Sequence, residues 1–355
     1  MAGAPNERST KKTEIGLVLQ GGGALGAYEW GGIQALFKLM KDAGDAGRDV
    51  TLRAVTGVSI GAINAACIVG ADEDKGPLAR LETLWNDFMI KAPAFVPAAV
   101  TLNLALLEVL RFYRFSPAWN WTSLYDTHEL LKTLSDHVSF DALNKSDTTF
   151  VVTAVDVETA DLMRFSNKKL GKLHPTTIKP EHILASGSLA PQFPWTKTSQ
   201  GSQSHYYWDG GLVDNTPLGD AIEAFTPGDD VTRLLVVMNL FPILAKRPDT
   251  FAQVNDRINQ LRFGNRLSQD TRNAERLNDL LCTIEKFIPH APSKLQDEAQ
   301  RALDKLKRVT PIEIMLSADT HYSDEDGFRD FSEQGIERRR KAGHQIALEK
   351  LGKYF

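Results

Sequence analysis

The pattern Gly57-Val58-Ser59-Ile60-Gly61 places one serine between two glycines, and it constrains the fold of this chain more than any other stretch. Residues 52–55 before it predict a short strand, and residues 62–69 after it favour a helix. A sharp strand-to-helix turn crowds the backbone, so small residues are needed on both sides of the serine. The stretch therefore predicts either an exposed nucleophile at such a turn or a serine that only caps a helix.

A glycine-rich loop follows the first predicted strand, which covers residues 14–20, and precedes a helix predicted over residues 28–41. The loop contains Gly21, Gly22 and Gly23. Consecutive glycines let the backbone approach a ligand and present several N–H groups in one place. The loop therefore predicts an anion site, for either a phosphate or the oxyanion of an acyl-transfer reaction.

The spacing Gly21-x-Gly23-x-x-Gly26 also satisfies the fingerprint of dinucleotide-binding folds. That fingerprint requires an acidic residue at the end of the second strand, where this chain has Gly57. A P-loop is not formed, because Ala27 stands where the lysine would be needed. We therefore prefer acyl transfer and keep a dinucleotide-binding protein as the alternative.

An aspartate that could serve as the base stands at the end of a predicted aromatic strand. This strand ends at Asp209, and Gly210 and Gly211 follow it. The two glycines permit a tight turn that leaves the carboxyl group at the strand end, although an ordinary Asp-Gly turn has the same sequence. A Ser-Asp-His triad is the chemical rival, and the histidines that its order would allow are His290, His321 and His344.

These three motifs, in this order, resemble the patatin-like phospholipase family. The resemblance runs from about Ile15 to Leu218 and includes the run of small and apolar residues 184–194. It implies an α/β fold, a three-layer α/β/α sandwich with a mostly parallel central sheet. It also implies hydrolysis of lipid acyl esters by a Ser-Asp dyad, without histidine, cofactor or metal.

Carried over residue by residue, the resemblance makes Ser59 the nucleophile and Asp209 the group that takes its proton. The oxyanion hole would consist of N–H groups of Gly21, Gly22, Gly23 and Ile60. The remaining motif positions are Gly26, Gly57, Gly61, Gly210 and Gly211.

One position departs from the family pattern, because Leu25 stands where members usually carry lysine or arginine. Without that cation the entrance should attract anionic head groups less. Phospholipid, lysophospholipid and neutral lipid therefore all stay open as substrates. The alternative from a different functional class is a catalytically silent or regulatory lipid-binding module. Such a module keeps the glycine loop but has no hydrolase activity.

Composition limits the remaining function classes. Of the 355 residues, 42% are hydrophobic, which fits a globular protein. The net charge is −4, so the composition does not indicate binding to nucleic acid. Only two cysteines are present, which favours a reducing, cytoplasmic location. Eight histidines occur without the spacing of a zinc motif, so we predict no metal site.

The pattern along the chain predicts a disordered leader over residues 1–13, a catalytic domain over 14–240 and a mostly helical extension over 241–355 that packs on the same domain. Strands are expected at 149–157, 161–165, 234–239 and 311–316, with helices at 251–287 and 293–308. Aromatic residues gather over 92–124, which predicts a lid, a peripheral contact with the inner membrane surface, or a buried core segment.

Overall fold

The structure is a computed structural model that describes residues 12–89, 123, 127–200, 203–228, 230–241, 247–303, 309, 312–316 and 327–355. Nearly all of the predicted leader and of the aromatic stretch 92–124 lies outside these residues. The first strand begins at Lys12, two residues inside the predicted leader.

The strands are β1 Lys12–Leu19, β2 Val50–Gly57, β3 Thr149–Asp156, β4 Leu162–Ser166, β5 Thr196–Gln200, β6 Gln203–Asp209, β7 Val231–Asn239 and β8 Ile312–Leu316. The helices are α1 Gly26–Asp45, α2 Ile60–Val69, α3 Pro77–Phe88, α5 His128–His137, α6 Phe140–Lys145, α7 Pro180–Ser186, α8 Leu218–Ala224, α9 Phe251–Phe287, α10 Ser293–Leu303 and α11 Glu333–Leu351. Short 3-10 turns are η1 Gly23–Leu25, η2 Gly210–Leu212, η3 Ile288–His290 and η4 Gly352–Tyr354.

The described strands form one eight-stranded sheet in the order β5-β6-β3-β2-β1-β7-β8, with β4 also paired to β3. β1 pairs in parallel with β2 and β7, β2 with β3, and β7 with β8. The pairs β3–β4, β3–β6 and β5–β6 are antiparallel. The predicted α/β class with a mostly parallel sheet is therefore confirmed.

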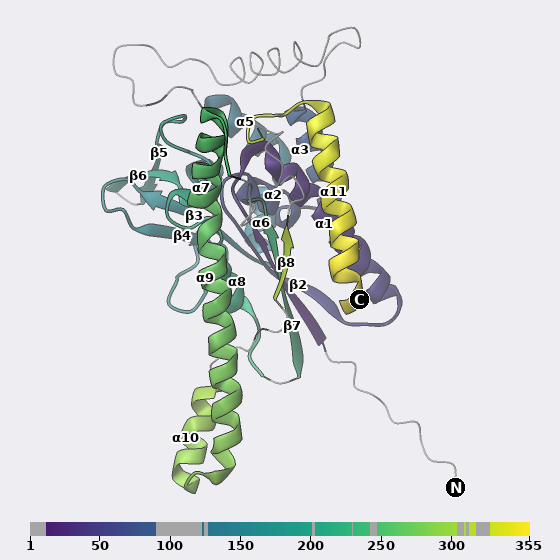
Figure 1. Cartoon of the computed structure of the whole chain (residues 1–355), viewed down its shortest axis with the longest axis vertical. Coiled ribbons are helices and arrows are strands. Elements are labelled where there is room, and N and C mark those ends of the chain that lie inside the picture. Colours follow the sequence, from purple (N-terminus) through teal and green to yellow (C-terminus); the bar gives the residue numbers. More distant parts are fainter. Residues whose placement is uncertain are drawn as a thin grey trace.

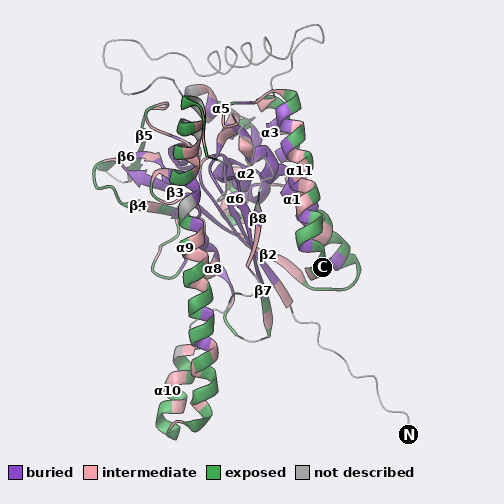
Figure 2. Cartoon of the chain, viewed as in Figure 1, coloured by how far each residue is buried: buried purple, intermediate pink, exposed green. Residues whose placement is uncertain are grey.

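Side chains of β1 enter two separate cores, which lie on the two faces of the sheet. Leu17 and Leu19 belong to a core shared with α1, α2 and α3. Val18 belongs to another core, with Leu218 of α8 and Leu267 of α9. Successive residues of a strand point to opposite faces, so this alternation places helices on both sides of the sheet, as Figure 1 and Figure 2 show.

The C-terminal part of the chain joins the same body. β8 extends the sheet beyond β7, and α11 lies along α1 (Figure 1). The boundary predicted at residue 240 stays a prediction. α9 and α10 extend beyond the sheet with largely exposed surfaces (Figure 2). In the described ranges, no helix is both long enough and apolar enough to cross a bilayer.

Two glycines bring the backbones of α1 and α11 into direct contact. A Cβ atom on Gly31 would lie 1.8 Å from the carbonyl oxygen of Arg340, and one on Gly343 would lie 1.9 Å from that of Tyr28. No side chain fits at such distances, so α11 can approach α1 this closely only because both positions are glycine.

We predict that Gly31→Ala lowers the free energy of unfolding by about 3 kcal/mol, because the added methyl group forces the two helices apart. Gly44→Ala in the same helix is the matched control, since nothing lies within 4 Å of its Cβ position. The control should be neutral or stabilising by up to about 1 kcal/mol. Urea unfolding of both variants checks this, and equal stability of the two would contradict the packing described.

Candidate active site

Ser59 occupies the predicted sharp turn between β2 and α2. Its backbone has φ 53° and ψ −123°, a conformation that favours glycine. A Cβ on Gly57 would lie 2.5 Å from the Gly61 carbonyl oxygen, and one on Gly61 would lie 2.5 Å from that of Leu19. The glycines are therefore required by the close stacking of β1, the turn and α2. Such strain in a non-glycine residue costs about 1–3 kcal/mol and is concentrated at functional sites.

Asp209 ends β6 and is only 3% exposed. One carboxylate oxygen accepts the N–H of Gly211 at 2.7 Å. Burial raises the pKa of Asp209 from 3.8 to about 7, and hydrogen bonds from Gly211 and from the Ser59 hydroxyl offset part of this rise. The structure thus brings the side chains of Ser59 and Asp209 together, although they lie far apart in the sequence.

One segment at the end of α7 contacts both of these residues. The N–H of Ser59 donates to the hydroxyl oxygen of Ser186 at 2.9 Å, and the N–H of Asp209 donates to the carbonyl of Ser188 at 3.0 Å. The segment belongs to the run 184–194 noted in the sequence. Its role as a bridge between the serine and the aspartate could not be inferred from composition, because neither contact leaves a local pattern.

The glycine loop joins β1 to α1, beside the serine turn. The N–H of Gly21 donates to Asn215 Oδ1 at 3.0 Å, and Asn215 Nδ2 donates back to the Gly21 carbonyl at 3.1 Å. Gly21 therefore has a protein acceptor, and we leave it out of the oxyanion donors proposed below. Among the described residues, the N–H groups of Gly22, Gly23 and Ile60 donate to no acceptor.

A buried carboxyl group lies behind this loop. Glu29 is fully buried, and its oxygens accept the Gln20 N–H at 2.7 Å and Asn64 Nδ2 at 2.9 Å. Burial raises the pKa of Glu29 well above its usual range. Glu29 lies in the first turn of α1. Sequence reasoning missed Glu29, Asn64 and Asn215.

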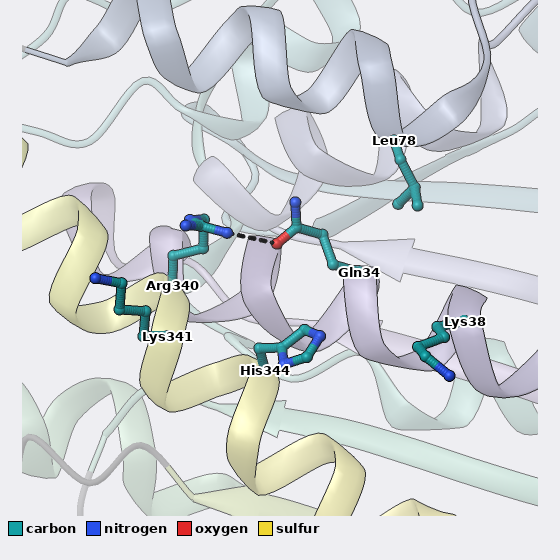
Figure 3. Close-up of a pocket in the computed structure, with 6 residues that line it drawn as sticks. All are labelled: Gln34, Lys38, Leu78, Arg340, Lys341 and His344. Carbon is teal, nitrogen blue, oxygen red and sulfur yellow. Dashed lines mark hydrogen bonds between the residues drawn. The ribbon is translucent and has the colours of Figure 1, made fainter.

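The histidines considered for a triad lie elsewhere or outside the described residues. His344 lines a cavity of about 400 Å³ between α1, α3 and α11, shown in Figure 3. His290 is exposed in η3, between α9 and α10, and His321 is not among the described residues. The side-chain partner of Asp209 in the described chain is Ser59 and not a histidine.

Metal ligands do not gather in the described ranges, where no three His, Cys, Asp or Glu side chains come close enough to hold an ion.

The family model described as "Patatin-like phospholipase" matches residues 17–222. The chain belongs to this family. The matched range holds the glycine loop, the serine turn and Asp209, and membership supports the activity of a lipid acyl hydrolase. Comparison with curated protein sequences gives no match.

Among solved structures, the crystal structure of VipD from Legionella pneumophila is similar to this chain. The two are 12% identical, with 97% of this chain and 67% of that chain covered, at a TM-score of 0.41.

We predict that Asp209→Asn stabilises the fold, and more so at higher pH. The folded pKa of about 7 lies above the ordinary 3.8, so the wild type loses stability as pH rises through this window. The asparagine does not titrate and can still accept the Gly211 N–H. Its advantage should grow from nothing below pH 4 to about 4 kcal/mol at pH 8.

Urea unfolding of the wild type and of the Asn variant at pH 4, 6 and 8 tests this prediction. Asp147→Asn, at a fully exposed carboxylate, is the control and should show no such trend. A difference between wild type and Asp209→Asn that does not change with pH would contradict the raised pKa.

Proposed function

We propose that this chain is a serine acyl hydrolase that cleaves carboxylic esters of lipids through Ser59 and Asp209. The observation that carries the proposal is the strained serine, whose hydroxyl meets a buried carboxyl group with a pKa of about 7. Family membership supplies the reaction class, and this pairing supports the roles of the two residues.

Asp209 is suited to act as the general base. A carboxylate with an ordinary pKa is a weak base toward a hydroxyl group, whereas catalytic groups work best with pKa values near the operating pH. Burial brings Asp209 into that range. In the proposed first step, Ser59 Oγ attacks the ester carbonyl carbon while its proton passes to Asp209.

The developing oxyanion would be stabilised by the N–H groups of Gly22, Gly23 and Ile60. These donors come from the glycine loop and from the start of α2, which directly follows Ser59. Each such donor is typically worth about 3 kcal/mol of transition-state stabilisation. The N-terminus of α2 adds a favourable dipole at the same place.

The reaction then continues through an acyl-enzyme. The tetrahedral intermediate collapses, the bond from the carbonyl carbon to the alkoxy oxygen breaks, and Asp209 returns its proton to the leaving alcohol. Asp209 next takes a proton from water as the water attacks the acyl group. Collapse of this second intermediate releases the fatty acid and restores the hydroxyl of Ser59.

The proposed lipid preference depends on Leu25. Leu25 lies in η1, within the glycine loop, so the first turn beside the proposed site carries an apolar side chain in place of a cation. We propose that neutral lipids and lysolipids are accepted at least as well as anionic phospholipids. A panel of lipid substrates with matched acyl chains measures this preference.

We predict that Ser59→Ala and Asp209→Asn each lower kcat/KM for a p-nitrophenyl ester at least about a thousandfold, because each removes one half of the nucleophile-base pair. Ser135→Ala, at an exposed serine of α5, is the control and should keep full activity. Near-normal turnover in either variant of the pair would reject the assignment.

Labelling with a fluorophosphonate separates the enzyme from a catalytically silent lipid-binding module. Only an activated serine reacts quickly, so the wild type and Ser135→Ala should be labelled and Ser59→Ala should not. The dinucleotide alternative predicts instead a thermal shift with NAD.

We predict that kcat rises with pH through a midpoint near 7, because Asp209 must be ionised to accept the serine proton. At pH 6 the rate should be about a tenth of its plateau above pH 8. Steady-state kinetics between pH 5 and 9 measure the profile. A rate that stays constant over this range would contradict a base with a raised pKa.

A further inference from the structure

The segment just before α11 contacts the glycine loop directly. The N–H of Ala24 donates to the carbonyl oxygen of Phe328 at 2.9 Å. Gly23 has a positive φ of 56°, and a Cβ atom on it would lie 2.5 Å from that same oxygen. The Phe328 carbonyl therefore accepts a hydrogen bond from Ala24 and packs against Gly23, the residue before it. Only glycine at position 23 leaves room for this oxygen.

The ring of Phe328 is also held in place. It packs against Phe241 and Phe263, with ring centroids 5.6 Å and 6.3 Å away. Phe241 in turn lies against the loop, 3.5 Å from the position that a Cβ on Gly22 would take. One aromatic cluster thus contacts the loop at Gly22 while the Phe328 carbonyl contacts it at Gly23 and Ala24.

A buried ion pair fixes the chain around Phe328. The side chain of Arg339 is fully buried, with Nη1 donating to the Asp330 carbonyl at 2.8 Å and Nη2 lying 3.2 Å from Asp330 Oδ2. Asp330 Oδ1 also accepts the hydroxyl and the N–H of Ser332, the residue that caps α11. Arg339 thereby connects residues 328–332 to α11. Gly31 and Gly343 in turn allow α11 to pack directly on α1.

We infer that Arg339 and Asp330 are positioning residues of the proposed acyl-transfer site. They hold the Phe328 carbonyl, and through Ala24 and Gly23 this carbonyl sets the direction of the Gly22 and Gly23 N–H groups. The inference rests on the proposed function. Arg339, Asp330 and Phe328 lie outside residues 17–222, so the part of the chain that matches the family model does not contain this support of the proposed oxyanion loop.

The charged pair is suited to this role more than to stability. Replacing a buried ion pair with apolar side chains of similar volume is often neutral or stabilising, whereas removing one partner leaves an uncompensated charge. What apolar side chains cannot supply is the directed hydrogen bond from Arg339 to the Asp330 carbonyl. Its loss should change the geometry of the loop while leaving the fold in place.

The test compares Arg339→Met/Asp330→Leu, Arg339→Lys and wild type by steady-state kinetics on a p-nitrophenyl ester, with thermal melting alongside. We expect the double variant to melt near the wild-type temperature, with kcat lowered 10- to 100-fold, KM changed less than threefold and the pH midpoint unchanged. Arg339→Lys keeps a charged donor and should recover part of the lost rate. This pattern distinguishes positioning of the oxyanion donors from general destabilisation.

Arg340→Gln is the matched control. Arg340 is the next residue of α11, but it pairs with Glu337. It also donates to Gln34, as Figure 3 shows. Among the described residues, no hydrogen bond joins its side chain to residues 328–332. Its kcat should stay within twofold of wild type. A folded double variant with wild-type kcat overturns the inference.

If the double variant does not fold, Arg339→Lys decides: a lowered kcat at unchanged KM supports the inference, and an unchanged kcat overturns it. Failure of the proposed function looks different. In that case the wild type itself neither turns over the ester nor reacts with a fluorophosphonate, whereas failure of this inference alone leaves Ser59→Ala inactive and every Arg339 variant fully active.

Discussion

The structure depends on a close approach of backbones at the serine turn. The carbonyl oxygens of Leu19 and Gly61 occupy space that any larger side chain at Gly61 or Gly57 would need. This crowding holds Ser59 in its positive-φ conformation and sets the glycine loop of β1 beside it. The nucleophile and the start of α2 are therefore placed by main-chain packing.

Two buried carboxyl groups flank the glycine loop, and their surroundings give them different tasks. Both have pKa values raised by burial. Asp209 lies beside the Ser59 hydroxyl group, whose proton we propose it accepts. Among the described residues, Glu29 accepts only amide N–H groups, and it fixes the start of the loop. A buried carboxyl group thus serves the proposed chemistry in one place and fixes geometry in the other.

Local patterns predicted much of the fold, and they supplied Ser59 and Asp209 as the pair of the proposed site. Glycines at fixed spacing marked the loop and the serine turn, and the apolar runs of β1 and β7 marked strands buried on both faces. Asn215, Glu29 and Arg339 could not be found in this way. Asn215 acts on Gly21, 194 positions away, and such pairings depend on the assembled sheet and leave no periodicity in the sequence.

The hydrogen bond between Ala24 and Phe328 also links two residues that lie far apart in the sequence. A ribosome finishes the glycine loop, the serine and the aspartate long before it reaches Phe328. A nascent chain that already carries every family motif thus lacks the carbonyl against which its loop rests. The contacts of the loop described above can therefore all form only after Phe328 has been synthesised.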